Sequence, residues 1–232
     1  MIPGYYKLYD YVSNSQLGSL EELIYGKTKP ENIQEIYDFG NLFDAVVTEE
    51  EKFNLESNIM TDQDREVLFE EYLVEKAMLM KQSVESDPLF KLILEEAKTQ
   101  HVIVRKAHQI DWMGFSFKMP IRIKMDLYIP NVLVVDLKST ACKTYKQFVA
   151  SINFFNYDRQ GAFYMDAAKV DKILFIGVCK YPNKRTGKHD VFKYMIHRNS
   201  EDYFSGLEKY SELAFKWDLM IRNFPKPSLL YI

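Results

Sequence analysis

The stretch "MDLYIPNVLVVDLKST", Met125 to Thr140, decides how the chain is expected to fold, because it joins a buried-strand pattern to charged residues. The run from Val132 to Val135 is continuously apolar, which is typical of a strand covered on both faces. Asp136 and Lys138 end this run, and Asp126 precedes it. Charged side chains at the end of a buried strand need partners, since burying an unpaired charge is costly.

A tight turn at Pro130-Asn131 brings these charged residues together. Proline and asparagine are favoured in turns, so the sequence predicts an antiparallel hairpin whose strands are joined there. Asp126 and Asp136 then lie level with each other to within one residue. Asp136 and Lys138 are two residues apart, so their side chains share one face of the strand. Two carboxylates and one ammonium are therefore expected to converge.

The residues before His101 show mainly helical patterns of apolar spacing. The first expected helix begins after Ser13 or Ser15 and ends at Gly26, and the second runs from Pro30 to about Thr48. A third is expected to begin after Thr61 and Asp64, with apolar residues from Val67 to Leu79 on one face. A fourth covers the segment "DPLFKLILEEAK".

The residues from 101 onward change to strand patterns with two helical segments between and after them. Strands are expected in "HVIVRKAHQI", "GFSFKMPIRIKMDLYI", "NVLVVDLKST", "KILFIGVCK" and "DVFKYMIH". A helix is expected from about Lys143 to Ala168, interrupted near "NFFNYD", and another after Asn199 or Ser200. The fold class predicted is α/β (α+β), with a helical half at 1–100 and a sheet core with flanking helices at 101–232.

The bulk composition bounds the class of protein. At 232 residues the chain fits one domain, 1–232, around one core. The net charge of −3 excludes a global field that attracts polyanions, so nucleic acid would have to bind locally. The first residues lack the pattern of an export signal, and no apolar run is long enough to span a membrane, so we expect a cytoplasmic protein with reduced cysteines and no membrane partner.

Asp126, Asp136 and Lys138 suit one particular chemistry. Carboxylates with backbone oxygens are ligands for a hard divalent ion such as Mg²⁺ or Mn²⁺, which keeps waters for substrate phosphates to replace. A lysine beside that ion can orient or help deprotonate the attacking water, and it can stabilise charge on a phosphate oxygen. The spacing alone fits a structural ion pair equally well, since such pairs also occur in buried networks.

A second pattern lies in the following helix. "FNYDRQGAFYMDAA" places Gln160 and Tyr164 four residues apart, on one helical face. Taken alone, Gln160 is equally interpreted as a surface amide and Tyr164 as an aromatic ring at the edge of the core. Taken together, the order D, then D-x-K, then Q-x-x-x-Y, on strand, strand and helix, resembles the PD-(D/E)XK nuclease superfamily. Within it, the sequence is most similar to phage and prophage recombination exonucleases of the exodeoxyribonuclease VIII and RecB-like type.

The resemblance extends toward the N-terminus. "VSNSQLGSL" resembles the "SxSxL" segment that opens the first helix of those proteins, and "DFGNLFDAVVT" resembles their "fGxxxHxxv" helix. Asp44 stands where the family commonly has a metal-binding histidine. Aspartate also ligates Mg²⁺, whereas a polar helix residue beside Phe43 and Val47 is the alternative interpretation.

The resemblance assigns roles to individual residues. The metal ligands expected are Asp126, Asp136, the backbone carbonyl of Leu137, and Asp44. Lys138 is the expected catalytic lysine, with Gln160 and Tyr164 shaping the site or meeting DNA phosphates. The expected phosphate contacts are Lys143, Lys146, Arg159, Lys184, Arg185 and Lys188. The last three lie in a basic turn that would equally serve solubility.

The family implies a restriction-endonuclease-like core, a mixed sheet flanked by helices, and Mg²⁺-dependent cleavage of DNA. It further implies 5′-to-3′ digestion of duplex ends, a ring-like homo-oligomer in some members, and cooperation with a single-strand annealing protein. Two alternatives stay open at this point. An endonuclease or nickase would share the same metal site, and a non-cleaving DNA-binding protein would share the same scaffold.

Overall fold

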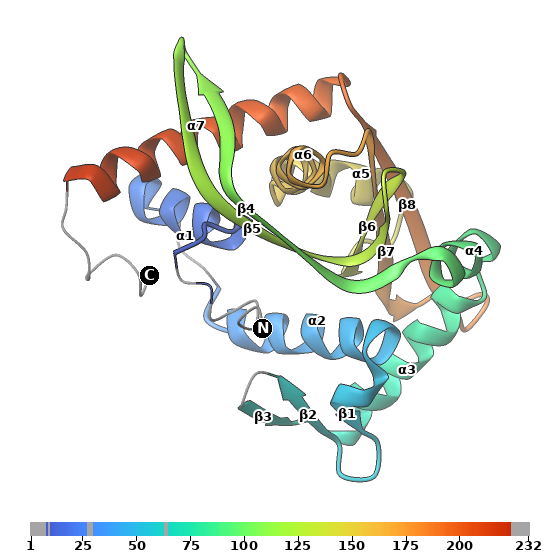
Figure 1. Ribbon diagram of the computed structural model, residues 1–232. Helices are drawn as coiled ribbons and strands as arrows, with labels where there is room; N and C mark the ends of the chain where they lie inside the picture. The colour runs from blue at the N-terminus through green and yellow to red at the C-terminus, as the bar shows by residue number, and fades with distance from the viewer. Residues whose placement is uncertain (1–7, 9, 27–29, 63–64, 224–232) are drawn as a thin grey trace.

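The computed structural model describes residues 8, 10–26, 30–62 and 65–223, and its centre is a five-stranded sheet (Figure 1). The strands are β4 (Lys98–Trp112), β5 (Phe115–Ile129), β6 (Leu133–Thr140), β7 (Lys172–Pro182) and β8 (His189–His197). They lie in the order β4-β5-β6-β7-β8, and every pair is antiparallel except β6 with β7. A parallel pair needs a crossover connection. Helices α5 (Tyr145–Phe154) and α6 (Tyr157–Ala168) supply it.

The expected hairpin between the two site-bearing strands is confirmed. Strands β5 and β6 are joined through Pro130-Asn131, and Asn131 has φ of 62°, a left-handed conformation that asparagine tolerates in turns. The strands pair from Leu127 with Val135 to Ile129 with Leu133.

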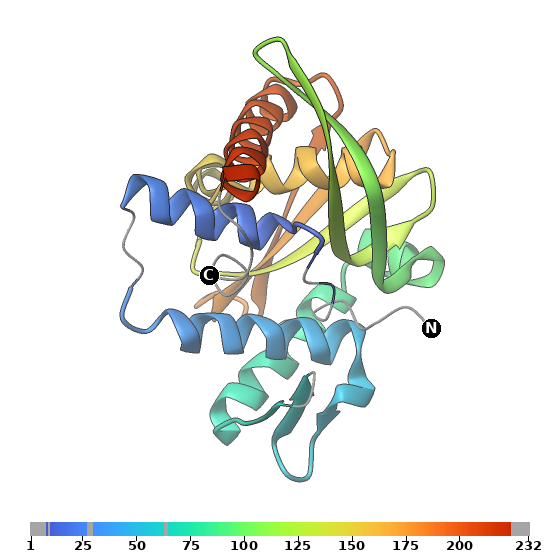
Figure 2. The ribbon, with the colours of Figure 1, turned by 60° about the vertical axis from the view of Figure 1, so that its left-hand side comes forward.

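Helices cover both faces of the sheet, so the core has two parts. Helices α5, α6, α1 (Asn14–Tyr25) and α7 (Glu201–Asn223) lie on one face, around Phe148, Phe163 and Phe175. Helices α2 (Ile33–Thr48), α3 (Glu71–Glu85) and α4 (Pro88–Glu96) lie on the other, around Phe43 and Val135. Figures 1 and 2 show the sheet between these two layers. A strand covered on both faces must be apolar where it is covered, which explains the apolar run from Leu133 to Val135 that begins β6.

The helical N-terminal half is confirmed in part. Ser13 caps α1 by a reciprocal pair of hydrogen bonds with Gln16, and Gly26 ends that helix with φ of 63°. Helix α2 begins at Ile33, three residues later than the expected start at Pro30.

The expected helix start at Thr61 and Asp64 is wrong. Residues 59–62 and 65–68 form strands β2 (Ile59–Asp62) and β3 (Arg65–Leu68), which pair in a small sheet with β1 (Phe53–Asn54). Met60 pairs with Val67 across the two strands, and both pack on the α2 and α3 side of the core. The alternation of buried and exposed side chains, with a period of two residues, therefore selects strands for this segment. Helix α3 starts only at Glu71. Asp64 lies outside the described residues.

The expected interruption of the helix after Lys143 is also confirmed. Asn156 adopts φ of 55° and separates α5 from α6, so that Tyr157 opens a new helix in a different direction. This break aims α6 across the sheet toward the charged end of β6. Among the described residues, no helix combines the length and the apolarity that crossing a membrane requires.

Candidate active site

Asp126 and Asp136 face each other where two strands separate. The last paired residues of β5 and β6 on this side are Leu127 and Val135, and one step further along the register are the two aspartates. The backbone N–H of Leu137 donates a hydrogen bond of 2.7 Å to Oδ2 of Asp126. This bond ties Asp126 to the neighbouring strand after the regular ladder has ended.

Asp136 is the most buried carboxylate of the site and has two side-chain neighbours. Lys138 lies on the same face of β6, and its Nζ is 2.5 Å from Oδ2 of Asp136. The amide of Gln160, reaching from α6, donates a hydrogen bond to Oδ1 of Asp136. Asp136 is 4% exposed, so its charge depends on these partners. The structure therefore brings together the residues of the D-x-K and Q-x-x-x-Y patterns.

Tyr157 and Tyr164 complete the surroundings of Lys138. Nζ of Lys138 lies 4.8 Å from the ring centroid of Tyr157, a cation–π geometry. Tyr164 is buried and lines the same cavity as Lys138 and Gln160. Tyr157 lies three residues before Gln160, so the helical spacing already placed it on the face of α6 that carries the site.

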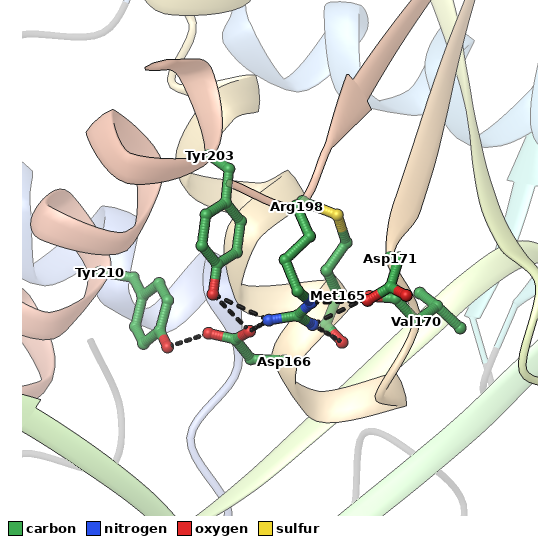
Figure 3. A network of polar contacts seen from close by, with 7 residues as sticks. All are labelled: Met165, Asp166, Val170, Asp171, Arg198, Tyr203 and Tyr210. Atoms are coloured by element: carbon green, nitrogen blue, oxygen red, sulfur yellow. Dashed lines mark hydrogen bonds and ion pairs between the residues drawn. The ribbon is translucent and has the colours of Figure 1, made fainter. Parts of the chain in front are cut away.

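An arginine network holds the far end of α6 (Figure 3). Arg198, after β8, donates hydrogen bonds to the carbonyls of Met165 and Val170, and it forms an ion pair with Asp166 at 2.7 Å. Tyr203 and Tyr210 of α7 both donate to Asp166. The C-terminal end of α6 is thus fixed against β8 and α7, which in turn fixes the helix that presents Gln160.

A cavity of about 240 Å³ opens between α1, α2, α6 and the separated ends of β5 and β6. Asp44, one of the expected metal ligands, lines it from α2, opposite the strand residues. The lining residues to which the sequence analysis gave no role in the site are Ser15, Asn41, Ala45, Glu49, Lys52, Met60, Gln100 and Lys124.

Glu49 and Lys124 are the most informative of these additional residues. Oε2 of Glu49 lies 3.5 Å from Nζ of Lys124, and Oε1 lies 2.8 Å from Nζ of Lys52. Lys124 precedes Asp126 by two residues and so shares its face of β5, a signal that the alternation in the sequence already contained. Glu49 follows the end of α2, and no local pattern in the sequence distinguishes it.

Burial and neighbouring carboxylates raise the pKa values of Asp126 and Asp44. Burial, followed by the neighbouring Asp136, raises the pKa of Asp126 to about 7. Burial, followed by Asp126, raises the pKa of Asp44 well above its ordinary value. Burial lowers the pKa of Lys138, but Asp136 more than compensates, so the pKa is raised overall and Lys138 carries an ammonium group. The site thus favours an added positive charge.

The donor set fits a hard divalent ion with few protein ligands. Oδ2 of Asp136 is buried and lies 2.5 Å from Nζ of Lys138. Within residues 8, 10–26, 30–62 and 65–223, no three Asp, Glu, His or Cys side chains are grouped tightly enough to hold a metal ion by themselves. Mg²⁺ commonly takes one or two carboxylates and keeps waters elsewhere. Asp126 and Asp136 match that requirement.

The sequence-predicted phosphate contacts do not gather in the cavity. Lys143 and Lys146 are exposed at the start of α5, and Lys184, Arg185 and Lys188 are exposed in the turn between β7 and β8. Arg159 lies instead beneath α1 and is 6% exposed. It pairs with Glu21 at 2.5 Å and donates to Asn14 at 3.1 Å. In this position Arg159 holds α1 against α6.

Comparison with known proteins adds to this geometry. The chain matches, over residues 18–214, the family described as "PDDEXK-like domain of unknown function (DUF3799)". No curated protein matches it. A protein described as a "Putative exonuclease" from Eubacterium rectale has a TM-score of 0.59 at 17% identity, covering 95% of this chain and 84% of that chain. This similarity confirms the expected fold class.

Two further solved structures are more distant. A phage related exonuclease from Haemophilus somnus 129PT has a TM-score of 0.42 at 15% identity, covering 89% of this chain and 94% of that chain. An alkaline exonuclease from Laribacter hongkongensis has a TM-score of 0.38 at 13% identity, covering 94% of this chain and 95% of that chain.

Proposed function

The chain belongs to the family of PDDEXK-like domains of unknown function, and on that premise we propose that it is a divalent-metal-dependent nuclease that hydrolyses DNA. One observation carries the proposal. Asp126 and Asp136 face each other at the separated ends of two strands, and Lys138 projects beside them into a cavity. A structural ion pair needs one carboxylate for one ammonium, whereas this site has a second carboxylate whose charge its surroundings disfavour.

Asp126, Asp136 and the backbone carbonyl of Leu137 would hold Mg²⁺, or Mn²⁺ in its place, and Asp44 would complete the ligand shell or orient a water. When bound, such an ion polarises the phosphate and makes a water more acidic. Gln160 keeps the Asp136 carboxylate in one orientation through its hydrogen bond.

Lys138 and Tyr164 have the positions of groups that contact substrate. Lys138 is an ammonium next to Asp136, so in the metal-free protein it acts as a hydrogen-bond donor and counter-charge, not as a base. The same charge can stabilise a phosphate oxygen as negative charge develops there. The Tyr164 side chain borders the cavity from α6 and would shape it around the scissile phosphate.

We extend the proposal to exonuclease action, 5′-to-3′ on duplex ends, in phage-type recombination. The resemblance of the whole sequence to phage and prophage recombination exonucleases supports it, whereas the order of the D, D-x-K and Q-x-x-x-Y elements supports the superfamily. A ring-like homo-oligomer and a single-strand annealing partner belong to the same proposal.

The deciding experiment is digestion of linear duplex DNA labelled separately at its 5′ and 3′ ends, with Mg²⁺ or with EDTA, beside a covalently closed circle. Early release of the 5′ label, a resistant circle and inactivity in EDTA are expected. The variant Asp136→Asn should lose activity by more than about 100-fold, because loss of even an outer-shell partner costs 10- to 100-fold. Asp111→Asn, at an exposed position near the β4–β5 turn, is the matched control.

The remaining outcomes separate the alternatives. Cleavage of the closed circle would identify an endonuclease and contradict exonuclease action. Binding of DNA without any product under Mg²⁺ or Mn²⁺ would show that the scaffold binds DNA without cleaving it.

A further inference from the structure

Three lysines from three different elements converge on two aromatic rings. Nζ of Lys76, in α3, lies 5.0 Å from the ring centroid of Phe39 and 5.5 Å from that of Tyr181. Nζ of Lys180, in β7, lies 5.1 Å from Phe39, and Nζ of Lys143, in the loop before α5, lies 5.2 Å from Tyr181. We call Lys76, Lys143, Lys180, Phe39 and Tyr181 the lysine–aromatic cluster.

The positive charge of this cluster is not neutralised from within the described part of the fold. None of the three lysines forms an ion pair with a carboxylate among the described residues, whereas Lys193 nearby on β8 pairs with Asp87. Burial lowers the pKa of Lys76, and burial followed by repulsion from Lys76 lowers the pKa of Lys180. Cation–π contacts orient an ammonium but leave its charge in place.

The cluster lies just beyond the candidate active site along the sheet. In the parallel pairing of β6 and β7, Lys138 is opposite Gly177 and Thr140 is opposite Cys179, so Lys180 comes directly after the last paired residue. Along the strand direction, three residues, about 10 Å, separate the register position of Lys138 from Lys180. Because three is an odd number, the side chain of Lys180 points to the opposite face of the sheet, where it meets Phe39 of α2. Lys143 follows Thr140 by three residues in the loop that leaves the same strand end.

Helix α2 connects the cluster to the candidate active site. Phe39 lies on α2, the helix that carries Asp44, and a Cβ on Gly40 would come 3.9 Å from Oγ of Ser139. The side chain of Phe39 is 5% exposed and packs in the core beside α3, whereas 51% of Tyr181 is exposed. A buried ring thus positions two lysines, and an exposed ring stands beside the third.

We propose that the lysine–aromatic cluster binds backbone phosphates of the DNA strand that occupies the candidate active site, so this inference rests on the proposed nuclease function. The exposed face of Tyr181 offers a surface on which a base or sugar can stack.

The basic turn found in the sequence continues the same path. Lys180 and Tyr181 lie near the end of β7. Lys184 and Arg185 follow in the connection between β7 and β8, and the side chains of Lys184 and Arg185 are exposed. Phosphate contacts would therefore extend from the cluster to this turn. Mutual repulsion between Lys76 and Lys180 costs stability in the free protein, and bound phosphates would remove that cost.

The test is the salt dependence of DNA binding by the double variant Lys76→Gln/Lys180→Gln. The control is Lys91→Gln/Lys172→Gln, which removes two exposed lysines, one of them eight residues from Lys180 at the other end of β7, about 26 Å away. The probe is a fluorescent 20-base-pair duplex in EDTA, with anisotropy titrations between 50 and 200 mM KCl. The slope of log K against log salt should become shallower by about 0.9 for each lysine removed, about 1.8 for the pair.

A second measurement excludes simple misfolding. Thermal unfolding of Lys76→Gln/Lys180→Gln should occur at the wild-type temperature or above it, because a repulsion has been removed. A slope equal to that of the wild type, or an equal change in the control, overturns the inference, as does a wild-type protein that fails to bind the duplex.

The nuclease function is tested separately by cleavage of the same duplex by the wild-type protein with Mg²⁺ or Mn²⁺. If cleavage is absent but the slopes differ as expected, the nuclease proposal fails and the cluster remains a DNA-binding surface. If cleavage is present but the slopes are equal, the nuclease proposal stands and the cluster inference fails.

Discussion

Oδ2 of Asp126 accepts a hydrogen bond of 2.7 Å from the backbone N–H of Leu137, at the point where β5 and β6 cease to pair with each other. A carboxylate thereby takes the place of the backbone carbonyl that would otherwise continue the ladder. This exchange opens the sheet locally and leaves room beside Asp136. The candidate site exists because the two strands separate there.

The first prediction concerns the pH dependence of stability in the metal-free protein. The pKa of Asp126 is about 7 in the folded chain and 3.8 ordinarily. The folded state therefore holds this proton more tightly, so the stabilisation is full below about pH 4 and is lost as pH rises through about 7. In EDTA, urea unfolding should show a free energy of unfolding that falls between pH 5 and pH 8.

Asp126→Asn should flatten this dependence, because the amide has no charge to bury. At pH 8 the variant should be more stable than the wild type by about 1–3 kcal/mol, and it should be inactive. Asp111→Asn, at an exposed position, should leave the pH dependence unchanged. Parallel curves for wild type and Asp126→Asn would contradict the assignment.

The second prediction concerns Gln160. Replacement by leucine removes the donor to Oδ1 of Asp136 and leaves a buried acceptor without its partner. If Asp136 binds the metal ion, activity at saturating DNA should fall about 10- to 100-fold, with a higher Mg²⁺ concentration needed for half-maximal rate. Gln109→Leu, exposed near the end of β4, is the control. An unchanged Mg²⁺ requirement would rule out a role for Gln160 in positioning Asp136.

The third prediction concerns Arg198, whose guanidinium bridges the end of α6 to its surroundings (Figure 3). A lysine reaches Asp166 but cannot bond both the Met165 and the Val170 carbonyls, because it lacks the planar fork of donors. Arg198→Lys should lower the free energy of unfolding by about 2–3 kcal/mol. Arg185→Lys, in the exposed turn, should change it by less than about 0.5 kcal/mol. Equal stability of the two variants would show that the network contributes little.

The fourth prediction compares one substitution at two glycines. A Cβ on Gly206 would come 2.0 Å from the carbonyl oxygen of Asp158, so α6 and α7 could not keep their close approach. Gly206→Ala should lower the free energy of unfolding by about 3 kcal/mol. Gly40→Ala, where the nearest atom is Oγ of Ser139 at 3.9 Å, should raise it by up to about 1 kcal/mol, as alanine suits a helix interior better. Chemical denaturation of both variants decides the comparison.

The helical N-terminal segment shows where local pattern misleads. Thr61 and the apolar residues that follow it were expected to open a helix, but Met60 and Val67 pair across two short strands. Over so few residues helical spacing and alternation overlap, and contact with the α2 and α3 side of the core selects the strands.

The candidate site divides in the same way between local and distant information. The sequence by itself determined that Asp126, Asp136 and Lys138 lie close together, because a turn and a period of two residues fix which side chains meet across a hairpin. Helical spacing likewise placed Gln160 with Tyr164. These relationships depend only on residues close together in the chain, and local backbone geometry is enough to specify them.

Only the tertiary structure decided which residues distant in the sequence lie next to each other. Arg159, which the sequence grouped with the phosphate contacts, lies buried against Glu21, and Lys76 joins Lys180 from an element more than a hundred residues away. Neither relationship has a local signature, because both depend on how α1 and α3 dock onto the sheet. That docking is set by the packing of two whole core layers, to which each residue contributes only a small part.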